Sequence, residues 1–317
     1  SLPRGDTAYR GGRGRGVFGG GLDSPSSYGL DVIDYITIAT LGNALDFGNL
    51  TTATNSLSSC SSAVRGLFGG GSQQPAGAKT TTIDYITISA TGNSFKFGDL
   101  SNTATSFPGS CSNSTRGLFA GGRTPTPLKV IDFATIATLG NVSSFGDLAV
   151  ARYYMSGCSS PTRGIFGGGL LTPTPITSMN DIEYVTISTL GDTQDFGDLT
   201  LARFGHASCS SPTRGIFIAG NIDIPGATNT IDYITIASLG DAIDFGDLAI
   251  TNRYLTACSS STRGIAAGGG LNPASPTFSD TIEYVTIDTL GNAQDFGNLT
   301  GARNLLSGCS DSHGGLG

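Results

Sequence analysis

Cysteine and histidine are the residues of this chain with the strongest intrinsic chemistry, because thiolates and imidazoles bind metals and act as nucleophiles or bases. The six cysteines are Cys60, Cys111, Cys158, Cys209, Cys258 and Cys309. They are 51, 47, 51, 49 and 51 residues apart, whereas a thiolate metal site needs close groupings such as Cys-x-x-Cys. The two histidines, His206 and His313, stand in a repeated and in a terminal position, which leaves little material for a catalytic triad. We therefore expect no catalytic residue, no metal site and no cofactor.

The regular spacing of the cysteines also argues against disulfides. Equivalent residues of neighbouring repeat units are expected about 10 Å apart, beyond the Cα separation of about 7 Å that a disulfide spans. The sequence therefore predicts six free thiols, buried as small apolar side chains. Free thiols are typical of folding in a reducing cytoplasm.

Charged side chains recur with the same period as the cysteines. One arginine opens the Arg-Gly segment of each later unit, and one acidic residue follows an isoleucine further along every unit. The arginines are Arg65, Arg116, Arg163, Arg214 and Arg263, and the acids are Asp34, Asp84, Asp132, Glu183, Asp232 and Glu283. Because the two sets are equally recurrent, we expect structural ion pairs between them rather than an anion-binding ring.

All of these residues belong to one repeat that occurs six times. Each copy holds Arg-Gly-(Leu/Ile/Val)-Phe-Gly-Gly-Gly or a close variant, then a segment like Ile-Asp-Tyr-Ile-Thr-Ile, then Gly-Asn or Gly-Asp, Phe-Gly-(Asp/Asn)-Leu and a cysteine. β-Branched and aromatic residues alternate in the second segment, and Gly-Asn or Gly-Asp is a hairpin signal. The pattern predicts four short strands per unit, and a period of this length is typical of propellers and solenoids.

The order of these segments resembles the kelch-type β-propeller repeat over nearly the whole chain. The similarity rests on a strand ending in a glycine pair, a loop, a tyrosine-bearing strand, a hairpin, and Leu-x-x-Ala-Arg, as in 148–152. The chain has the phenylalanine of Phe-Gly-Asp-Leu near the place where kelch repeats carry tryptophan, so it is kelch-like. Its Arg-Gly-Leu-Phe-Gly-Gly-Gly and Ile-Asp-Tyr-Ile-Thr-Ile-Ala-Thr-Leu-Gly-Asn segments also resemble propeller modules in virion and tail-associated proteins of marine phages, especially cyanophages.

We therefore expect an all-β fold, a six-bladed β-propeller of four-stranded antiparallel blades. The first unit begins at its second strand, at Arg15, and the last cysteine segment, 305–312, lacks a following strand of its own. Pairing of these N- and C-terminal strands would close the ring without a long free edge. Residues 1–14 are expected to form an N-terminal arm and residues 15–317 a single domain. A start without methionine and an end within a repeat predict a piece of a longer protein.

Differences in length between the units are concentrated in six loops between the glycine pair and the isoleucine strand. The loops are 22–32, 72–82, 123–130, 170–181, 221–230 and 271–281, and they hold nine of the 13 prolines. We expect them on one face, as variable loops on a constant scaffold, which is the usual division between support and recognition. Unconstrained drift explains the same variation. The candidate binding residues on this face are Tyr28, Asp31, Lys79, Arg123, Lys129, Asp181, Asp223 and Phe278.

Composition excludes two classes of partner. The net charge is −7 and the pI is near 4.7, and binding to a phosphate backbone needs clustered lysine and arginine. We therefore expect no nucleic acid. No run of the chain approaches the roughly 18 apolar residues that cross a bilayer, so we expect no membrane insertion.

The resemblance implies a non-enzymatic binding or structural module of the virion or tail-fibre type. Its loop face would serve in receptor binding and host attachment, through a host-surface protein or glycan, or dock onto other virion proteins. A protein ligand is favoured over a glycan, because Tyr28 and Phe278 are the aromatic residues of the loops. The expected location is the virion, made in the host cytoplasm, or otherwise the extracellular space. The alternative is a glycan-degrading lyase or hydrolase, which would need two well-placed carboxylates.

Overall fold

The structure, a computed structural model, describes residues 14–23, 28–73, 77–101, 106–173, 175–222, 226–271 and 277–316. In this part of the chain there are six four-stranded antiparallel sheets and one short 3₁₀ turn, Gly314–Leu316. The all-β class predicted from the sequence is therefore confirmed. Of the candidate binding residues, Asp223 lies outside the described ranges.

The first three sheets come from the first half of the chain and from its end. Sheet 1 consists of β33 (Ser307–Ser310), β1 (Arg15–Gly19), β3 (Val32–Thr37) and β4 (Leu45–Asn49). Sheet 2 consists of β6 (Ser58–Ser61), β7 (Arg65–Gly69), β10 (Thr82–Thr87) and β11 (Phe95–Asp99). Sheet 3 consists of β12 (Gly109–Ser112), β13 (Arg116–Ala120), β16 (Val130–Thr135) and β17 (Ser143–Asp147).

The other three sheets repeat the same order. Sheet 4 consists of β18 (Ser156–Ser159), β19 (Arg163–Gly167), β22 (Asp181–Thr186) and β23 (Gln194–Asp198). Sheet 5 consists of β24 (Ala207–Ser210), β25 (Arg214–Ile222), β26 (Gly226–Thr235) and β27 (Ile243–Asn252). Sheet 6 consists of β28 (Thr256–Ser259), β29 (Arg263–Ala267), β30 (Thr281–Thr286) and β31 (Gln294–Asn298).

Short strands at the loop-bearing ends of the sheets join the variable loops to the links between sheets. They are β2 (Leu22–Asp23), β5 (Thr54–Asn55), β8 (Ser72–Gln73), β9 (Ala78–Lys79), β14 (Arg123–Thr124), β15 (Thr126–Pro127), β20 (Leu170–Pro173), β21 (Ile176–Ser178) and β32 (Arg303–Asn304). β5 pairs with β8, and β2 pairs with β32. Single bridges such as Tyr153↔Leu170 make the equivalent connection elsewhere. The variable loops and the links therefore lie on one face, as the sequence predicts.

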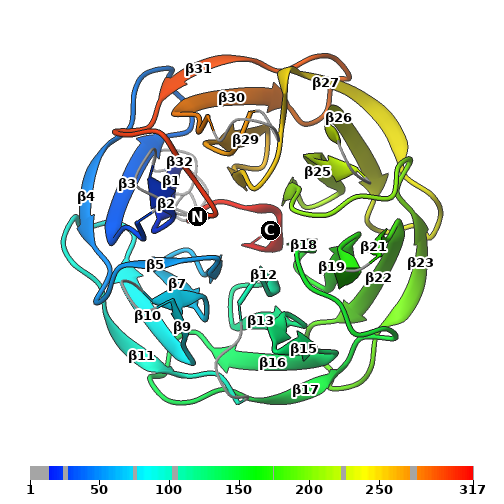
Figure 1. Cartoon of the computed structure of the whole chain (residues 1–317), viewed down its shortest axis with the longest axis horizontal. Helices are drawn as coiled ribbons and strands as arrows, with labels where there is room; N and C mark the ends of the chain where they lie inside the picture. Colours follow the sequence, from blue (N-terminus) through cyan, green and yellow to red (C-terminus); the bar gives the residue numbers. More distant parts are fainter. Residues whose placement is uncertain are drawn as a thin grey trace, which may run out of the picture.

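The six sheets stand around a common centre, with the cysteine-bearing strands innermost (Figure 1). Each innermost strand contacts the innermost strand of both neighbouring sheets, in the cyclic order β33, β6, β12, β18, β24, β28. The last strand, β33, pairs with β1 from Gly16↔Ser310 to Gly19↔Ser307, which is the N- to C-terminal pairing that the sequence predicts. The arrangement is consistent with a propeller-like fold.

Buried serines tie the innermost strands to one another. Each hydroxyl donates to the backbone carbonyl of the equivalent serine on the preceding strand, over 2.5–2.8 Å. The serines are Ser61, Ser112, Ser159, Ser210, Ser259 and Ser310, and we call this cycle the serine ring. The bond from Ser61 to Ser310 closes the cycle between β6, the first innermost strand along the chain, and β33, the last. The serine after each cysteine thus makes a hydrogen bond between neighbouring sheets.

The cysteines explain the glycine of every Arg-Gly segment. All six thiols are free and buried, as the sequence predicts. A Cβ built on Gly117 of sheet 3 would lie 2.4 Å from Sγ of Cys60 in sheet 2, and the same relation links the other five pairs. Burial raises the pKa of these thiols, to about 12 for Cys209 and Cys309. Each thiol therefore acts as an apolar group that fits where the next sheet has no side chain.

We expect Gly117→Ala to lower the free energy of unfolding by about 1–3 kcal/mol, because the added methyl group overlaps Cys60 Sγ in a close-packed interface. Cys60→Ala in the same chain should remove much of the penalty, since it vacates that space. Urea denaturation of the two single variants and the double variant measures the coupling. Strictly additive losses would contradict the contact.

Candidate functional site

The recurrent arginines do not pair with the recurrent acids, so the predicted ion pairs are wrong. Arg65, Arg116, Arg163, Arg214 and Arg263 lie over the aromatic ring of their own third strand, with Cζ 4.5–4.8 Å from the centroid. Each also donates from Nη1 to a carbonyl of the next sheet, as Arg65 does to Ile136 over 2.7 Å. The reason is register. Arg65 lies opposite Thr87, whereas Asp84 lies opposite Phe68, at the other end of the paired strands.

The acids instead connect each sheet to the link from the preceding sheet. A β-bulge against the fourth strand follows the isoleucine in every sheet, as between Ile33 and Asp34. In five of the six sheets the isoleucine and the acid after it are both buried, because the bulge interrupts alternation. Each carboxylate accepts the backbone N–H of the residue after the leucine of Phe-Gly-(Asp/Asn)-Leu. The acceptors are Asp34, Asp84, Asp132, Glu183, Asp232 and Glu283.

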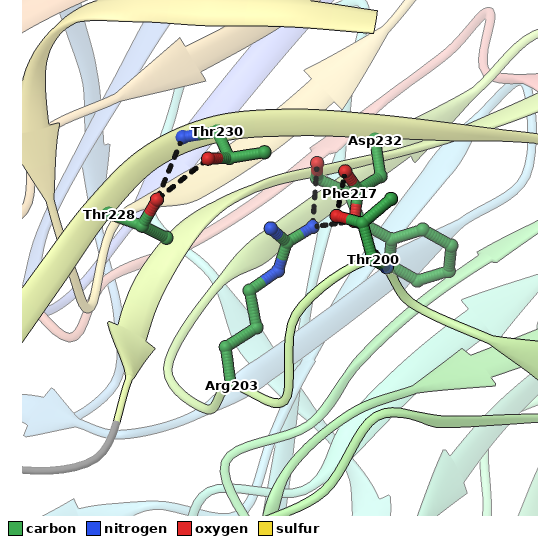
Figure 2. A network of polar contacts seen from close by, with 6 residues as sticks. All are labelled: Thr200, Arg203, Phe217, Thr228, Thr230 and Asp232. Atoms are coloured by element: carbon green, nitrogen blue, oxygen red, sulfur yellow. Dashed lines mark hydrogen bonds and ion pairs between the residues drawn. The ribbon is translucent and has the colours of Figure 1, made fainter. Parts of the chain in front are cut away.

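Three of these carboxylates form buried ion pairs with the arginine of Leu-x-x-Ala-Arg. The pairs are Arg152–Glu183 at 2.9 Å, Arg203–Asp232 at 2.9 Å and Arg303–Asp34 at 3.0 Å. Figure 2 shows the second pair, in which Arg203 Nη2 also donates to the Phe217 carbonyl and Thr200 Oγ1 donates to Asp232. Burial lowers the pKa of Arg203, and the charge of Asp232 opposes that change. These pairs are structural connections between sheets, away from the centre.

We expect Arg203→Met to lower the free energy of unfolding by about 3–5 kcal/mol, because it leaves the Asp232 carboxylate as an unpaired buried charge. Asp232→Asn added to Arg203→Met should recover much of that loss. Urea denaturation tests both variants. A loss below about 1 kcal/mol for Arg203→Met would mean that the ion pair contributes no more than a surface pair.

The six innermost strands enclose a space at the centre, which we call the central channel. A second closed cycle surrounds its loop-facing end, and we call this cycle the mouth ring. Each member donates its backbone N–H to the carbonyl of the equivalent residue in the preceding unit over 2.6–3.1 Å. The members are Ser56, Phe107, Tyr154, Gly205, Tyr254 and Leu305. All have φ between 53° and 63°, a left-handed conformation that is uncommon for bulky residues and often marks functional positions. The cycle imposes one backbone geometry on side chains of very different kinds.

Three aromatic members of the mouth ring form a continuous wall. The centroids of Phe107 and Tyr154 are 3.9 Å apart, and those of Tyr154 and Tyr254 are 5.1 Å apart. Gly205 makes room for this contact, because a Cβ there would lie 2.7 Å from the Tyr254 ring. All three aromatic side chains are partly exposed. Tyr153 packs against Tyr154 from behind, 5.2 Å away.

The wall borders a cavity of about 120 Å³ at the centre of the loop face. Leu305 and Ser56 line it together with the aromatic residues. Its floor carries side chains from the first residues of the innermost strands. They include the hydroxyl-bearing residues Ser58, Ser110, Ser156, Ser208, Thr256 and Ser307. The site thus combines apolar and aromatic walls with hydroxyl groups, and its lining contains no Asp, Glu, Lys or Arg among the described residues.

The C-terminal turn occupies the other end of the channel. His313 Nε2 donates to the Ser61 carbonyl over 2.9 Å, and Gly315 N–H donates to His313 Nδ1 over 3.1 Å. This pattern requires a neutral imidazole with the proton on Nε2, and burial lowers the pKa of His313 accordingly. A ligand of the cavity therefore enters from the loop face.

His206 lies beside the cavity but belongs to the core. It is 4% exposed and packs on Phe217 with ring centroids 5.9 Å apart. The equivalent position holds Leu57, Leu255 or Leu306 in other units. Burial lowers the pKa of His206 well below its usual value, and the positive charge of Arg203 adds to the effect. The imidazole is therefore a neutral packing group.

His206 should make the protein less stable in acid. The unfolded chain binds a proton at this residue below pH about 6.5 while the folded chain does not, so stability falls as the pH drops from there towards the lower folded pKa. His206→Leu should remove roughly 2 kcal/mol of the stability change between pH 7.5 and pH 5. Urea denaturation at several pH values measures it. Identical pH slopes for the two proteins would refute a buried neutral imidazole.

Among the predicted loop residues that the structure describes, two lie together. Lys79 Nζ donates to the Arg123 carbonyl over 2.7 Å, and the Arg123 guanidinium lies over Tyr153 with Cζ 5.3 Å from the centroid. Partial burial and the charge of Arg123 lower the pKa of Lys79. These two residues therefore flank the aromatic wall.

The other predicted residues lie in separate loops. Tyr28 is exposed and donates its backbone N–H to Asp23. Asp31 accepts from Leu50 N–H through its carbonyl. Lys129 forms an exposed ion pair with Asp147, Asp181 lies exposed on β22, and Phe278 bridges Gly270.

The aromatic wall was missed because it lies in segments of nearly constant length. Sequence reasoning assigned variability to segments that differ in length, and the distance from Phe-Gly to the cysteine is 13 residues in five of the six units. The sequence signal that could have revealed the wall was the change of residue type at one position of the repeat. Position 154 holds Tyr and its equivalents hold Ser, Phe, Gly, Tyr and Leu, although the segment has nearly the same length in every unit.

In the described residues there is no group of three or more His, Cys, Asp or Glu side chains placed to hold a metal ion. Within the same residues, no helix has the length and hydrophobicity to span a bilayer. No protein-family model matches the chain, and no curated protein matches it.

Proposed function

We propose that this chain is a six-bladed β-propeller that acts as a non-enzymatic binding or structural module of a phage virion or tail fibre. Its loop face recognises a protein or glycan on the host surface or docks onto other virion proteins. The six sheets and the pairing of β33 with β1 support the six-bladed form. The kelch-like segments and their similarity to marine-phage propeller modules support the setting.

The mouth ring is the observation that carries the proposal. Six positions share one backbone conformation and one hydrogen-bond cycle, yet their side chains differ from unit to unit. Because the backbone conformation and the hydrogen bonds are the same at all six positions, this variation in side chains fits selection for what they contact. The variable loops rise around the same mouth, because their bases pair with the links that carry it.

Binding fits this cavity better than glycan cleavage does. A glycosidase requires two carboxyl groups about 5–10 Å apart across the scissile bond. The cavity presents aromatic rings, aliphatic groups and hydroxyls. Those groups position and desolvate a ligand without transferring a proton at neutral pH.

Moving each variable loop to the next unit tests the proposal, because it keeps the loop composition and changes only the arrangement. We expect the permuted protein to fold and melt like the parent but to lose attachment. Binding of the fluorescently labelled protein to cultured marine cyanobacteria measures host recognition, and co-sedimentation with phage particles measures virion docking.

The matched control is the double variant Leu190→Thr with Leu239→Thr. These exposed leucines lie in hairpin turns at the opposite ends of the sheets, where the equivalent Thr91 stands. Unchanged attachment of the permuted protein would sink the proposal.

A further inference from the structure

Positive charges without acidic partners flank the aromatic wall of the mouth ring. Arg253 stacks on Tyr254 with Cζ 5.4 Å from the centroid, whereas Arg123 stacks on Tyr153 and accepts a hydrogen bond from Lys79 through its carbonyl. None of these three cations takes part in the ion pairs formed within the described residues. In a chain of net charge −7, cations left without carboxylates at one place indicate an anionic ligand.

Arg253 in particular has few hydrogen-bond acceptors. Its Nη1 reaches Asn221 Oδ1 over 3.4 Å, at the outer limit for a hydrogen bond. Its Nε is buried without a partner among the described residues. A guanidinium offers five N–H groups in a planar fork that matches a carboxylate or sulfate. An anionic group beside Tyr254 would supply acceptors for the terminal guanidinium nitrogens.

The cavity next to Arg253 suits a sugar ring. Aromatic faces carry negative charge density, and the C–H bonds on one face of a pyranose point positive charge toward such a face. Floor hydroxyls such as those of Ser208 and Thr256 both donate and accept, as sugar hydroxyls do. An aliphatic peptide side chain would leave buried hydroxyls unpaired, at a cost in affinity.

The size of the cavity limits what it can hold. A volume of about 120 Å³ is roughly ten times the 10–15 Å³ that a cavity needs to hold one water molecule, which leaves room for one sugar ring but not for a chain of them. The remainder of a glycan would then extend over the loops, toward Arg123 and Lys79.

We propose that the mouth ring binds one acidic sugar unit of a surface glycan, stacking its ring on Tyr154 and Tyr254 and pairing its carboxylate or sulfate with Arg253. This inference rests on the proposed function and names the ligand of its loop face. It reverses the preference for a protein ligand. That preference was based on the aromatic residues of the variable loops alone. In the structure, the aromatic residues of the site come from the links between sheets.

Two variants separate the parts of the site. Arg253→Asn removes the cation and is compatible with the backbone, since Asn55 and Asn304 hold the equivalent position. Tyr154→Leu removes the stacking face and places the residue that Leu305 already carries at φ 53°. Lys96→Gln is the charge-matched control, because Lys96 is an exposed residue paired with Asp99 on an outer strand.

Titration followed by saturation-transfer NMR uses four probes: methyl glucuronide, glucose 6-sulfate, methyl glucoside and inorganic sulfate. We expect at least one acidic sugar to bind more tightly than methyl glucoside and sulfate, and to bind more weakly at high salt. Arg253→Asn should weaken that binding at least fivefold and Tyr154→Leu at least tenfold. Lys96→Gln should leave the affinity unchanged.

Several results would overturn the inference. They are preference for the neutral sugar, equal binding of inorganic sulfate alone, no binding of either acidic sugar, or unaltered affinity in both variants. Loop-dependent attachment to cells that neither acidic sugar inhibits would refute the sugar site while leaving the proposed function intact. Loss of both attachment and sugar binding in well-folded permuted protein would support the two together.

Discussion

The rest of the molecule depends on one constraint: every interface between neighbouring sheets must be built in the same way. The serine ring shows this constraint directly, because the same hydrogen bond is made at all six interfaces. Each hydroxyl in the ring satisfies a carbonyl of the preceding strand, and Ser61 completes the cycle through Ser310. A misplaced strand would leave buried polar groups unpaired at two interfaces at once. The same constraint explains why the Arg-Gly segment, the cysteine and the acidic residue at the β-bulge recur in the units with so little variation.

Freedom remains where the intersheet contacts use only the backbone. The mouth ring is held by N–H to carbonyl bonds, which every residue type except proline can make. Side chains at its members are therefore released from a structural role and can differ between units. Three of these positions hold Phe107, Tyr154 and Tyr254, which form the aromatic wall. A fourth holds Gly205, which leaves space for the Tyr254 ring. Arg253 lies one position away and brings charge to the wall.

Local patterns predicted the parts of the fold that depend on neighbours in sequence. Alternating β-branched and aromatic residues and Gly-Asn or Gly-Asp turns marked the strands, and the presence of one cysteine in each unit predicted free thiols. The partners of Asp34 and Arg65 could not be predicted in that way. Their placement depends on a bulge and on register, which send Asp34 to Arg303 in the last repeat and Arg65 to the Ile136 carbonyl.

The sequence by itself determined the repeat, its four strands, the burial of its cysteines and the face on which the loops vary, because these follow from residue type and spacing within one unit. Only the tertiary structure decided which units meet at the centre and which side chains they bring there. Tyr154 and Tyr254 are 100 residues apart in sequence and 5.1 Å apart at the mouth. Cyclic packing of the sheets creates that contact, and no pattern within a single repeat contains it.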